Sequence, residues 1–161
     1  MLIVKKIIDV LNPHLASFVT GVLTALAAIL VGYFITVYWL ESTAEIEQLI
    51  ADEARYALQA PCGAEQYAAM FTEDAEIADG YAKKTYSGRK EIASRFRELP
   101  RFEKLSHDLD GSPDISDNNS AYAKTTSTIV FEDERHVGHE EWWFKKTDGR
   151  WKIKTLRYNN P

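Results

Sequence analysis

The feature that most constrains this chain of 161 residues is a run from Val10 to Leu40 that contains no Asp, Glu, Lys or Arg. A transmembrane helix needs about 20 consecutive, mainly apolar residues, and this run is longer. The apolar core of a signal peptide is shorter, at about 7 to 15 residues. The run ends in aromatic residues that suit a membrane–water interface: Tyr33, Tyr38 and Trp39. Residues 15–40 are therefore predicted to form an uncleaved transmembrane anchor; the alternative is a buried helix of a soluble protein.

Charges on either side of the run predict its orientation. Lys5 and Lys6 precede it, whereas acidic residues begin at Glu41. Because positively charged flanks stay in the cytoplasm, we expect a cytoplasmic N-terminus and an extracytoplasmic domain at residues 41–161. Residues 1–14 are expected to form a short N-terminal segment that lies in the membrane interface.

Small residues recur along one face of the predicted span. Ser17, Gly21 and Ala25 are four residues apart, and Ala28 and Gly32 extend nearly the same stripe. Small faces allow helices to pack closely in lipid. The stripe predicts contact with a partner helix, from another membrane subunit or a second copy. The alternative is the ordinary abundance of Gly and Ala in membrane helices.

Beyond the run the chain is acidic. Setting aside Lys5, Lys6 and Asp9 leaves 17 basic and 23 acidic residues, a net charge of −6. A nucleic-acid surface needs a basic stripe, so no nucleic-acid partner is expected. The single cysteine, Cys62, cannot form an internal disulfide; we expect a half-buried thiol near a helix end, with an interchain disulfide as the alternative.

The first part of the remaining chain has helical spacing. Apolar residues in 41–60 recur at helical intervals, and Pro61 ends the segment. Further helices are predicted at 64–71 and at 89–98, the last stopped by Pro100.

The later part alternates as strands do. The predicted strands are 76–79, 102–110, 120–132, 137–146 and 151–158. Asp148-Gly149 between the last two predicts a tight hairpin. Residues 41–161 are therefore predicted to form an α+β domain, with about three helices packed on a curved antiparallel sheet.

Three motifs resemble one known family. MFTEDAEIAD at 70–79, SGRKEI at 87–92 and WWFKKTDGRWKI at 142–153 are similar to the nuclear transport factor 2-like superfamily. This superfamily includes SnoaL-like cyclases, ketosteroid isomerases and scytalone dehydratases. The resemblance covers about 44–158 and implies a cone, in which a bent sheet is wrapped by helices around an open pocket. Because this fold carries unrelated activities, the resemblance alone does not define a function.

The ketosteroid isomerase pattern places three site residues on this chain. It implies Asp79 as a base, with Tyr56 and Glu141 as hydrogen-bond donors to a developing oxyanion. The chain departs from the pattern, since Gly80 follows the base and a glutamate stands at 141 beside Glu140. The alternative is structural: Asp79 caps a loop, Tyr56 fills the core and Glu141 is solvated.

Histidines supply further candidates. The resemblance implies that His107 faces the pocket, where it would hold a water or relay a proton. The alternative is a partly buried strand histidine bonded to a neighbour. His136 and His139 are spaced for opposite strand faces or a turn, so we expect no metal site and no cofactor.

Adjacent tryptophans are expected on opposite faces of one strand. One of Trp142 and Trp143 should enter the cone, and the other should cover the outer sheet surface. An exposed large aromatic side chain is a typical anchor of a protein interface.

Two functions are consistent with these patterns. The first is a noncatalytic, membrane-anchored binding or assembly module, an accessory subunit that contacts the bilayer and other membrane subunits or a second copy. The second is a SnoaL-like or ketosteroid isomerase-like enzyme that moves a proton on a small apolar substrate. We favour the first, because an anchor adds little to chemistry on a soluble substrate. Convergence of Asp79, Tyr56, Glu141 and His107 on one open pocket would favour the second.

Overall fold

The computed structural model describes residues 13–80 and 82–159. The segment predicted to lie in the membrane interface falls mostly outside these residues. The chain divides into two compact units, Met1–Leu40 and Glu41–Pro161, and the boundary coincides with the end of the predicted span.

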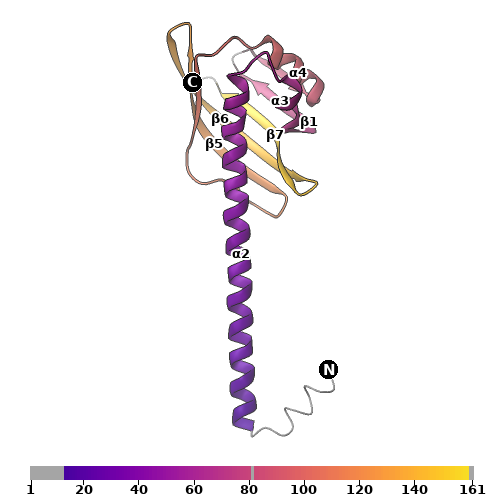
Figure 1. The fold of residues 1–161 in the computed structure, drawn as a ribbon, viewed down its shortest axis with the longest axis vertical. Helices are drawn as coiled ribbons and strands as arrows, with labels where there is room; N and C mark the ends of the chain where they lie inside the picture. The colour runs from indigo at the N-terminus through magenta and orange to yellow at the C-terminus, as the bar shows by residue number, and fades with distance from the viewer. Residues whose placement is uncertain (1–12, 81, 160–161) are drawn as a thin grey trace. The chain divides into compact units, whose positions relative to one another are not determined.

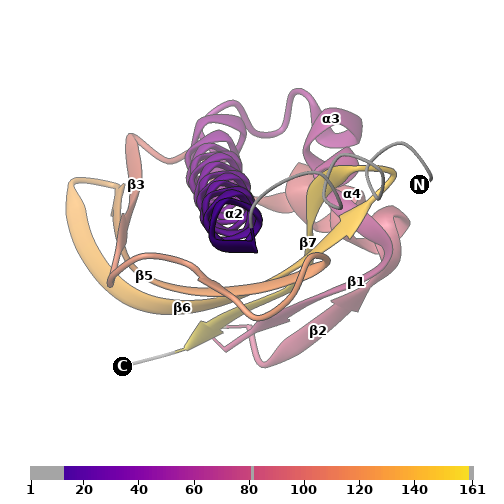
Figure 2. The ribbon, with the colours of Figure 1, turned by 90° about the horizontal axis from the view of Figure 1, so that it is seen from below.

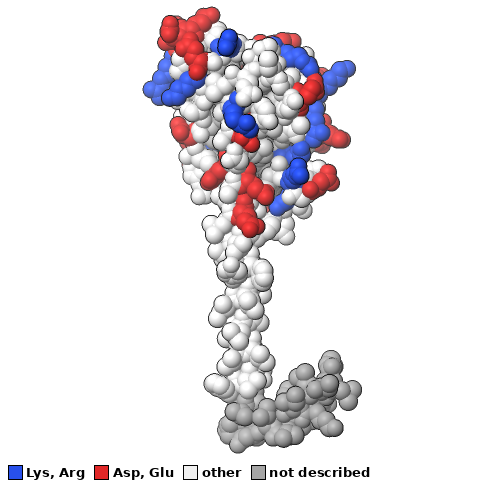
Figure 3. Space-filling view, viewed as in Figure 1, with Lys and Arg blue, Asp and Glu red and all other residues white. Residues whose placement is uncertain are grey.

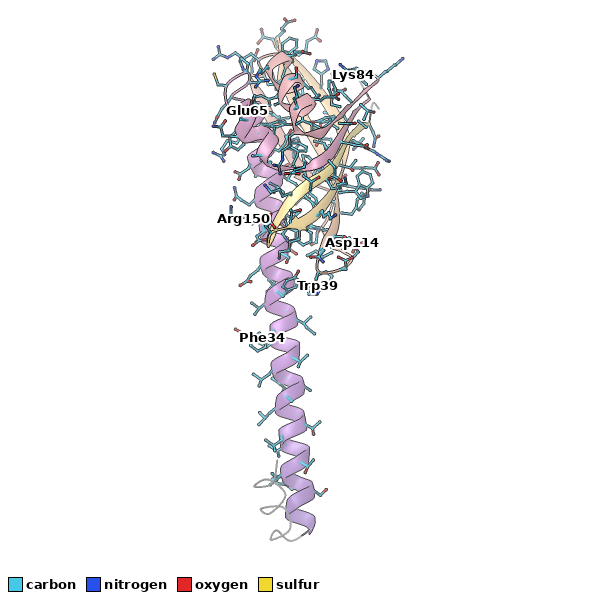
Figure 4. The ribbon with its side chains drawn as sticks, turned by 90° about the vertical axis from the view of Figure 1, so that its right-hand side faces the viewer. Phe34, Trp39, Glu65, Lys84, Asp114 and Arg150 are labelled. Carbon is cyan, nitrogen blue, oxygen red and sulfur yellow. The ribbon has the colours of Figure 1, made fainter. Side chains whose placement is uncertain are left out.

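Helix α2 (Pro13–Ala57) is the first described element (Figure 1). Between residues 17 and 40 it carries no charged side chain, as the uniformly uncharged part of Figure 3 shows. Its large apolar side chains are exposed there; Phe34, 68% exposed, and Trp39 project from the helix in Figure 4. The helix is long and apolar enough to cross a membrane, and none of its most apolar stretch is buried.

The separate helix predicted at 41–60 is instead the continuation of α2. Between Gly32 and Pro61 the chain contains no glycine or proline, so nothing breaks the ladder of backbone hydrogen bonds. The helix ends at Ala57, shortly before the proline. Ser42 lies inside the helix and is buried.

The second unit contains a seven-stranded sheet, in the order β2-β1-β7-β6-β5-β3 with β4 paired to β5. Its strands are β1 (Phe71–Asp79), β2 (Lys84–Ser87), β3 (Lys104–Leu109), β4 (Asp114–Ile115), β5 (Ser120–Phe131), β6 (Glu134–Thr147) and β7 (Arg150–Asn159). As predicted, the unit is α+β.

One strand pair differs from the predicted antiparallel sheet, since β1 and β7 run parallel. Strand β1 also begins five residues earlier than predicted, with a register irregularity between Phe71 and Glu76. Helix formation ends at Ala69 because the backbone of the next residues joins the sheet: Ile153 N donates to Met70 O at 3.0 Å. The early start of β1 was not visible in the sequence at 71–75, because the register irregularity interrupts the alternation of buried and exposed side chains that marks a strand.

Helices cover one face of the curved sheet (Figure 2). They are the part of α2 from Glu41 onward, α3 (Ala64–Ala69) and α4 (Gly88–Glu98). Between helices and sheet lies one apolar core; its largest fully buried members are Trp142, Tyr67, Phe71 and Phe96. Cys62, expected to be half-buried, is exposed because it lies in the turn between α2 and α3.

The predicted hairpin joins β6 to β7. Asp148 and Gly149 both have positive φ, 52° and 75°, as a two-residue turn between twisted strands requires. This turn fixes the register of β6 against β7. It therefore also fixes which residues of β6 face the helices.

Candidate functional site

A cavity of about 390 Å³ opens beneath the helices of the second unit. Its wall is mainly apolar, formed by Ala57, Leu99, Pro100, Phe102, Leu105, Ile129 and Phe131. Its polar side chains are Glu53, Asp79, Arg95, His107, His136, Glu140 and Tyr158. An apolar cavity of this size with a few convergent polar groups is typical of a small-molecule site.

Of the four catalytic candidates, two lie at this cavity and two do not. Asp79 and His107 line it. Tyr56 instead packs at the edge of the core, with the Arg55 guanidinium 4.9 Å from the centre of its ring. Glu53 and Ala57, four residues apart on α2, occupy the cavity face in its place.

Glu141 lies on the outer face of the sheet. Its carboxylate accepts hydrogen bonds from Tyr122 Oη at 2.8 Å and Asn159 Nδ2 at 3.3 Å. Because side chains alternate along β6, the neighbouring Glu140 points inward and is 2% exposed. The inward carboxylate of this strand is therefore Glu140, one residue from the predicted position.

His107 joins two carboxylates from different elements. Its Nε2 lies 2.8 Å from Glu53 Oε2 of α2 and is hydrogen-bonded to it. Its Nδ1 lies 2.8 Å from Glu140 Oε2 of β6, an ion-pair contact without hydrogen-bond alignment. The side chains of all three residues are at least 98% buried. We call Glu53, His107 and Glu140 the buried triad.

The two carboxylates keep the imidazole protonated. Burial alone would lower the pKa of His107, but Glu140 and Glu53 outweigh it and raise this pKa to about 10. In the unfolded chain the ring titrates near pH 6.5. The stability that follows from this shift is fully present below about pH 6.5 and is lost as the pH rises through about 10.

Two phenols face the Glu53 end of the buried triad. Tyr67 Oη donates to Glu53 Oε1 at 2.7 Å, and Tyr158 Oη lies 3.4 Å from the same oxygen. Burial opposes the charge of Glu53, but His107 and Tyr67 outweigh it, so the pKa of Glu53 falls. Burial and the Glu53 charge raise the pKa of both phenols. Tyr67 and Tyr158 are therefore neutral hydrogen-bond donors at physiological pH.

Asp79 forms a second charged pair at the cavity. Its Oδ2 accepts from Arg95 Nη2 at 2.8 Å and from Nε at 3.3 Å, and its Oδ1 accepts from the Ala82 backbone N–H at 2.9 Å. The guanidinium lies over the rings of Tyr86 and Tyr158, at 5.5 and 5.1 Å. Asp79 thus combines a turn bond with an ion pair whose side chains are only 11% and 9% exposed.

Glu140 differs from Glu53 and Asp79 in that only one of its two carboxylate oxygens accepts a hydrogen bond from the described residues. Thr125 Oγ1 donates to Glu140 Oε2 at 2.9 Å, and His107 contacts the same atom. None of the described residues donates a hydrogen bond to Glu140 Oε1. Glu140 lines the cavity, and Oε1 is the oxygen of its carboxylate that the described residues leave without a donor.

Trp142 and Trp143 occupy opposite faces, as predicted. Trp142 is fully buried and packs edge-on against His107, with 5.3 Å between ring centres. Trp143 is half-buried on the outer face, where it contacts Tyr122 and the Arg157 guanidinium. Neither tryptophan lines the cavity, which stays open.

Besides His136, sequence reasoning missed four polar residues of the cavity. Glu53 falls on the helix stripe of Ile46 and Ile50, and Arg95 lies beside Phe96 on the buried face of α4. For both Glu53 and Arg95, the signal in the sequence was a charged residue on the apolar face of a helix, which indicates a buried charge. Glu140 and Tyr158 required the strand registers, which alternation alone does not fix.

Comparison with known proteins gives one family and many structures. A model of the SnoaL-like domain matches residues 39–157. A putative scytalone dehydratase from Novosphingobium aromaticivorans has a TM-score of 0.65 at 20% identity, over 78% of this chain and 88% of that one. An NTF2-like protein with a cystatin-like fold from the same organism has a TM-score of 0.58 at 25% identity, over 84% and 88%.

A third structure, an NTF-2 like protein of unknown function from Shewanella oneidensis, has a TM-score of 0.63 at 14% identity, over 73% of this chain and 98% of that one. A search of curated proteins gives no match. These likenesses confirm the predicted fold and leave the chemistry to the residues of the cavity.

The Asp79–Arg95 pair generates a prediction about stability. Asp79→Asn keeps an acceptor for the Ala82 N–H but leaves the buried Arg95 without its charged partner. Breaking one side of a buried pair costs about 3 kcal/mol or more, which for a domain of this size lowers the melting temperature by about 10 °C. Thermal unfolding of the full chain in detergent measures the change.

The matched control is Glu65→Gln, which breaks the exposed Arg97–Glu65 pair; Glu65 is labelled in Figure 4. This change should cost less than about 1 kcal/mol. Equal melting temperatures for the two variants would show that the Asp79–Arg95 pair does not stabilise the fold. Unchanged stability with lost activity would instead assign Asp79 the base role of the ketosteroid isomerase pattern.

Proposed function

The chain belongs to the SnoaL-like domain family, and we propose that it is an enzyme that removes a proton from a small, mainly apolar molecule, with Glu140 as the general base. The observation that carries this proposal is the Glu140 carboxylate at an open, apolar cavity, where Thr125 and His107 hold Oε2 and none of the described residues donates a hydrogen bond to Oε1.

Charge balance favours proton uptake at this position. With both carboxyls ionised and His107 protonated, the buried triad carries a net charge of −1, whereas Asp79 and Arg95 neutralise each other. An uncompensated charge is poorly solvated by an apolar wall. A proton accepted by Glu140 removes that charge and leaves the Glu53–His107 pair intact.

The cavity also holds a donor for the product of proton removal. When a proton leaves a carbon next to a carbonyl, the electron pair moves into a new double bond and the carbonyl oxygen becomes negative. Tyr158 is a neutral donor whose contact with Glu53, at 3.4 Å, is long. Its O–H can therefore turn to the developing oxyanion at little cost. Return of the proton to another carbon completes an isomerisation; loss of a neighbouring hydroxyl as water completes a dehydration.

The wall restricts the substrate. Aromatic and aliphatic side chains form most of the lining, so burial of an apolar body drives binding. The charged end then requires one polar group, a carbonyl or hydroxyl, on that body. We infer a neutral molecule, because an anion would face the excess negative charge of the buried triad.

The site favours this enzyme over the noncatalytic subunit that the sequence patterns favoured. The discriminating feature was convergence of Asp79, Tyr56, Glu141 and His107 on one open pocket, and only Asp79 and His107 line the cavity. The additional presence of Glu140 and Glu53 at this open cavity supports the enzyme alternative. An assembly role would rest on the small-residue stripe and on Trp143. That the small-residue stripe and Trp143 contact partner proteins stays a prediction.

We propose further that residues 15–40 anchor the enzyme in a membrane, with the N-terminus in the cytoplasm and residues 41–161 outside it. A mainly apolar substrate partitions into the bilayer, so an anchor would hold the enzyme where the substrate is concentrated. The length and composition of α2 support this proposal.

Replacement of Glu140 tests the function. The assay is deuterium incorporation from D₂O into a panel of small ketones with apolar bodies, catalysed by the full chain in detergent. Glu140→Gln keeps the shape and removes the base, so exchange should fall by about 10² to 10⁴-fold. Glu141→Gln, the matched control on the outer face, should stay within about twofold of the wild type. Full activity of Glu140→Gln, or no exchange by the wild type with any ketone, would contradict the proposal.

Membrane extraction tests the anchor. Membranes from expressing cells are washed with alkaline carbonate, and the protein should remain in the pellet because a spanning helix resists this treatment. A variant lacking residues 1–40 is the control and should appear in the supernatant if it folds. Release of the intact full chain into the supernatant would contradict membrane anchoring.

A further inference from the structure

Behind Glu140 lies a chain of buried hydrogen bonds with a fixed direction. Trp142 Nε1 donates to Thr125 Oγ1 at 2.9 Å, and Thr125 Oγ1 lies 2.9 Å from Glu140 Oε2. An indole N–H can only donate, so the threonine oxygen is the acceptor of that bond. The single hydroxyl proton of Thr125 is therefore directed at the Glu140 carboxylate.

Strand register produces this arrangement. Thr125 of β5 is directly opposite Glu140 of β6, and Ala123 is opposite Trp142. The three polar side chains therefore share the inner face of one antiparallel pair. Thr125 and Trp142 are fully buried and Glu140 is 2% exposed, so water does not compete for these bonds.

Two groups thus hold the same carboxylate oxygen. Thr125 bonds Glu140 Oε2 on one side, and His107 Nδ1 contacts it at 2.8 Å on the other. Trp142 also packs edge-on against the His107 ring, with an interplanar angle of 79°. With Oε2 held in this way, rotation of the carboxylate is restricted and Oε1 keeps one orientation.

We propose that Thr125 and Trp142 are positioning residues that orient the Glu140 carboxylate for proton transfer. This inference rests on the proposed function of Glu140. Neither residue lines the cavity, so both act through Glu140 and not on a substrate.

Thr125→Val tests the inference, because it nearly preserves the shape of the side chain and removes the hydroxyl. We expect kcat in the ketone exchange assay to fall at least tenfold with KM changed less than twofold. Thr125→Ser, which keeps the hydroxyl, should restore kcat. Thr126→Val is the matched control, since the Thr126 hydroxyl bonds Asp110 on the outer face, and it should have no effect.

A second measurement does not depend on activity. The NMR signal of the Trp142 indole N–H, assigned by Trp142→Phe, should shift in Glu140→Gln, because the Thr125 hydroxyl links the indole to the carboxylate. In the Thr125→Val background Glu140→Gln should no longer shift this signal, and in the Thr125→Ser background the shift should return. A purely structural role for Thr125 would leave the shift caused by Glu140→Gln unchanged in the Thr125→Val background.

The two readouts separate the two proposals. If the wild type exchanges no ketone but the indole shift caused by Glu140→Gln depends on the Thr125 hydroxyl as expected, the proposed function fails and the coupling of Thr125 and Trp142 to Glu140 stands. If Glu140→Gln abolishes exchange but Thr125→Val behaves like Thr126→Val in both assays, the positioning inference is overturned and the proposed function stands.

Discussion

The structure depends on the burial of one imidazolium between two carboxylates. Removal of such charges from water is costly, and an ion pair of this kind is often no more stabilising than well-packed apolar side chains. Glu53, His107 and Glu140 are nevertheless almost fully buried beside an apolar cavity. Strongly shifted pKa values in a cleft are common at functional sites. The burial of this triad at an open cavity is therefore the feature on which the proposed function rests.

The fold positions the triad by bringing three distant segments together. Glu53 comes from the last turns of α2, His107 from β3 and Glu140 from β6. Strand β5 pairs with both β3 and β6, so it carries His107 and Glu140 on its two neighbours. The Asp79–Arg95 pair, by contrast, holds the end of β1 to α4. Loss of the triad contacts or of the Asp79–Arg95 pair would change the lining of the cavity and would also loosen the packing of a helix against the sheet.

Alternation and turn residues predicted most strands, the Asp148-Gly149 hairpin and the opposite faces of Trp142 and Trp143. His107 and Asp79 were placed at the cavity by resemblance. The predicted positions of Glu141 and Tyr56 at the cavity were each wrong by a few residues or fewer. On a strand, a shift of one residue moves a side chain to the opposite face, so Glu140 and not Glu141 points inward. On a helix, a shift of one to three residues turns a side chain away from the cavity, so Glu53 and Ala57 lie there and Tyr56 does not. Parallel pairing of β1 and β7 joins segments far apart in sequence, and no local pattern records it.

The most direct test of this account is the protonation state of His107, measured from the ¹⁵N chemical shifts of its ring and assigned by His107→Gln. The account predicts that both ring nitrogens carry protons at pH 8 and that the ring deprotonates only near pH 10, because Glu53 and Glu140 raise its pKa to about 10. A ring nitrogen without a proton at pH 8 would contradict the protonated imidazole held between Glu53 and Glu140.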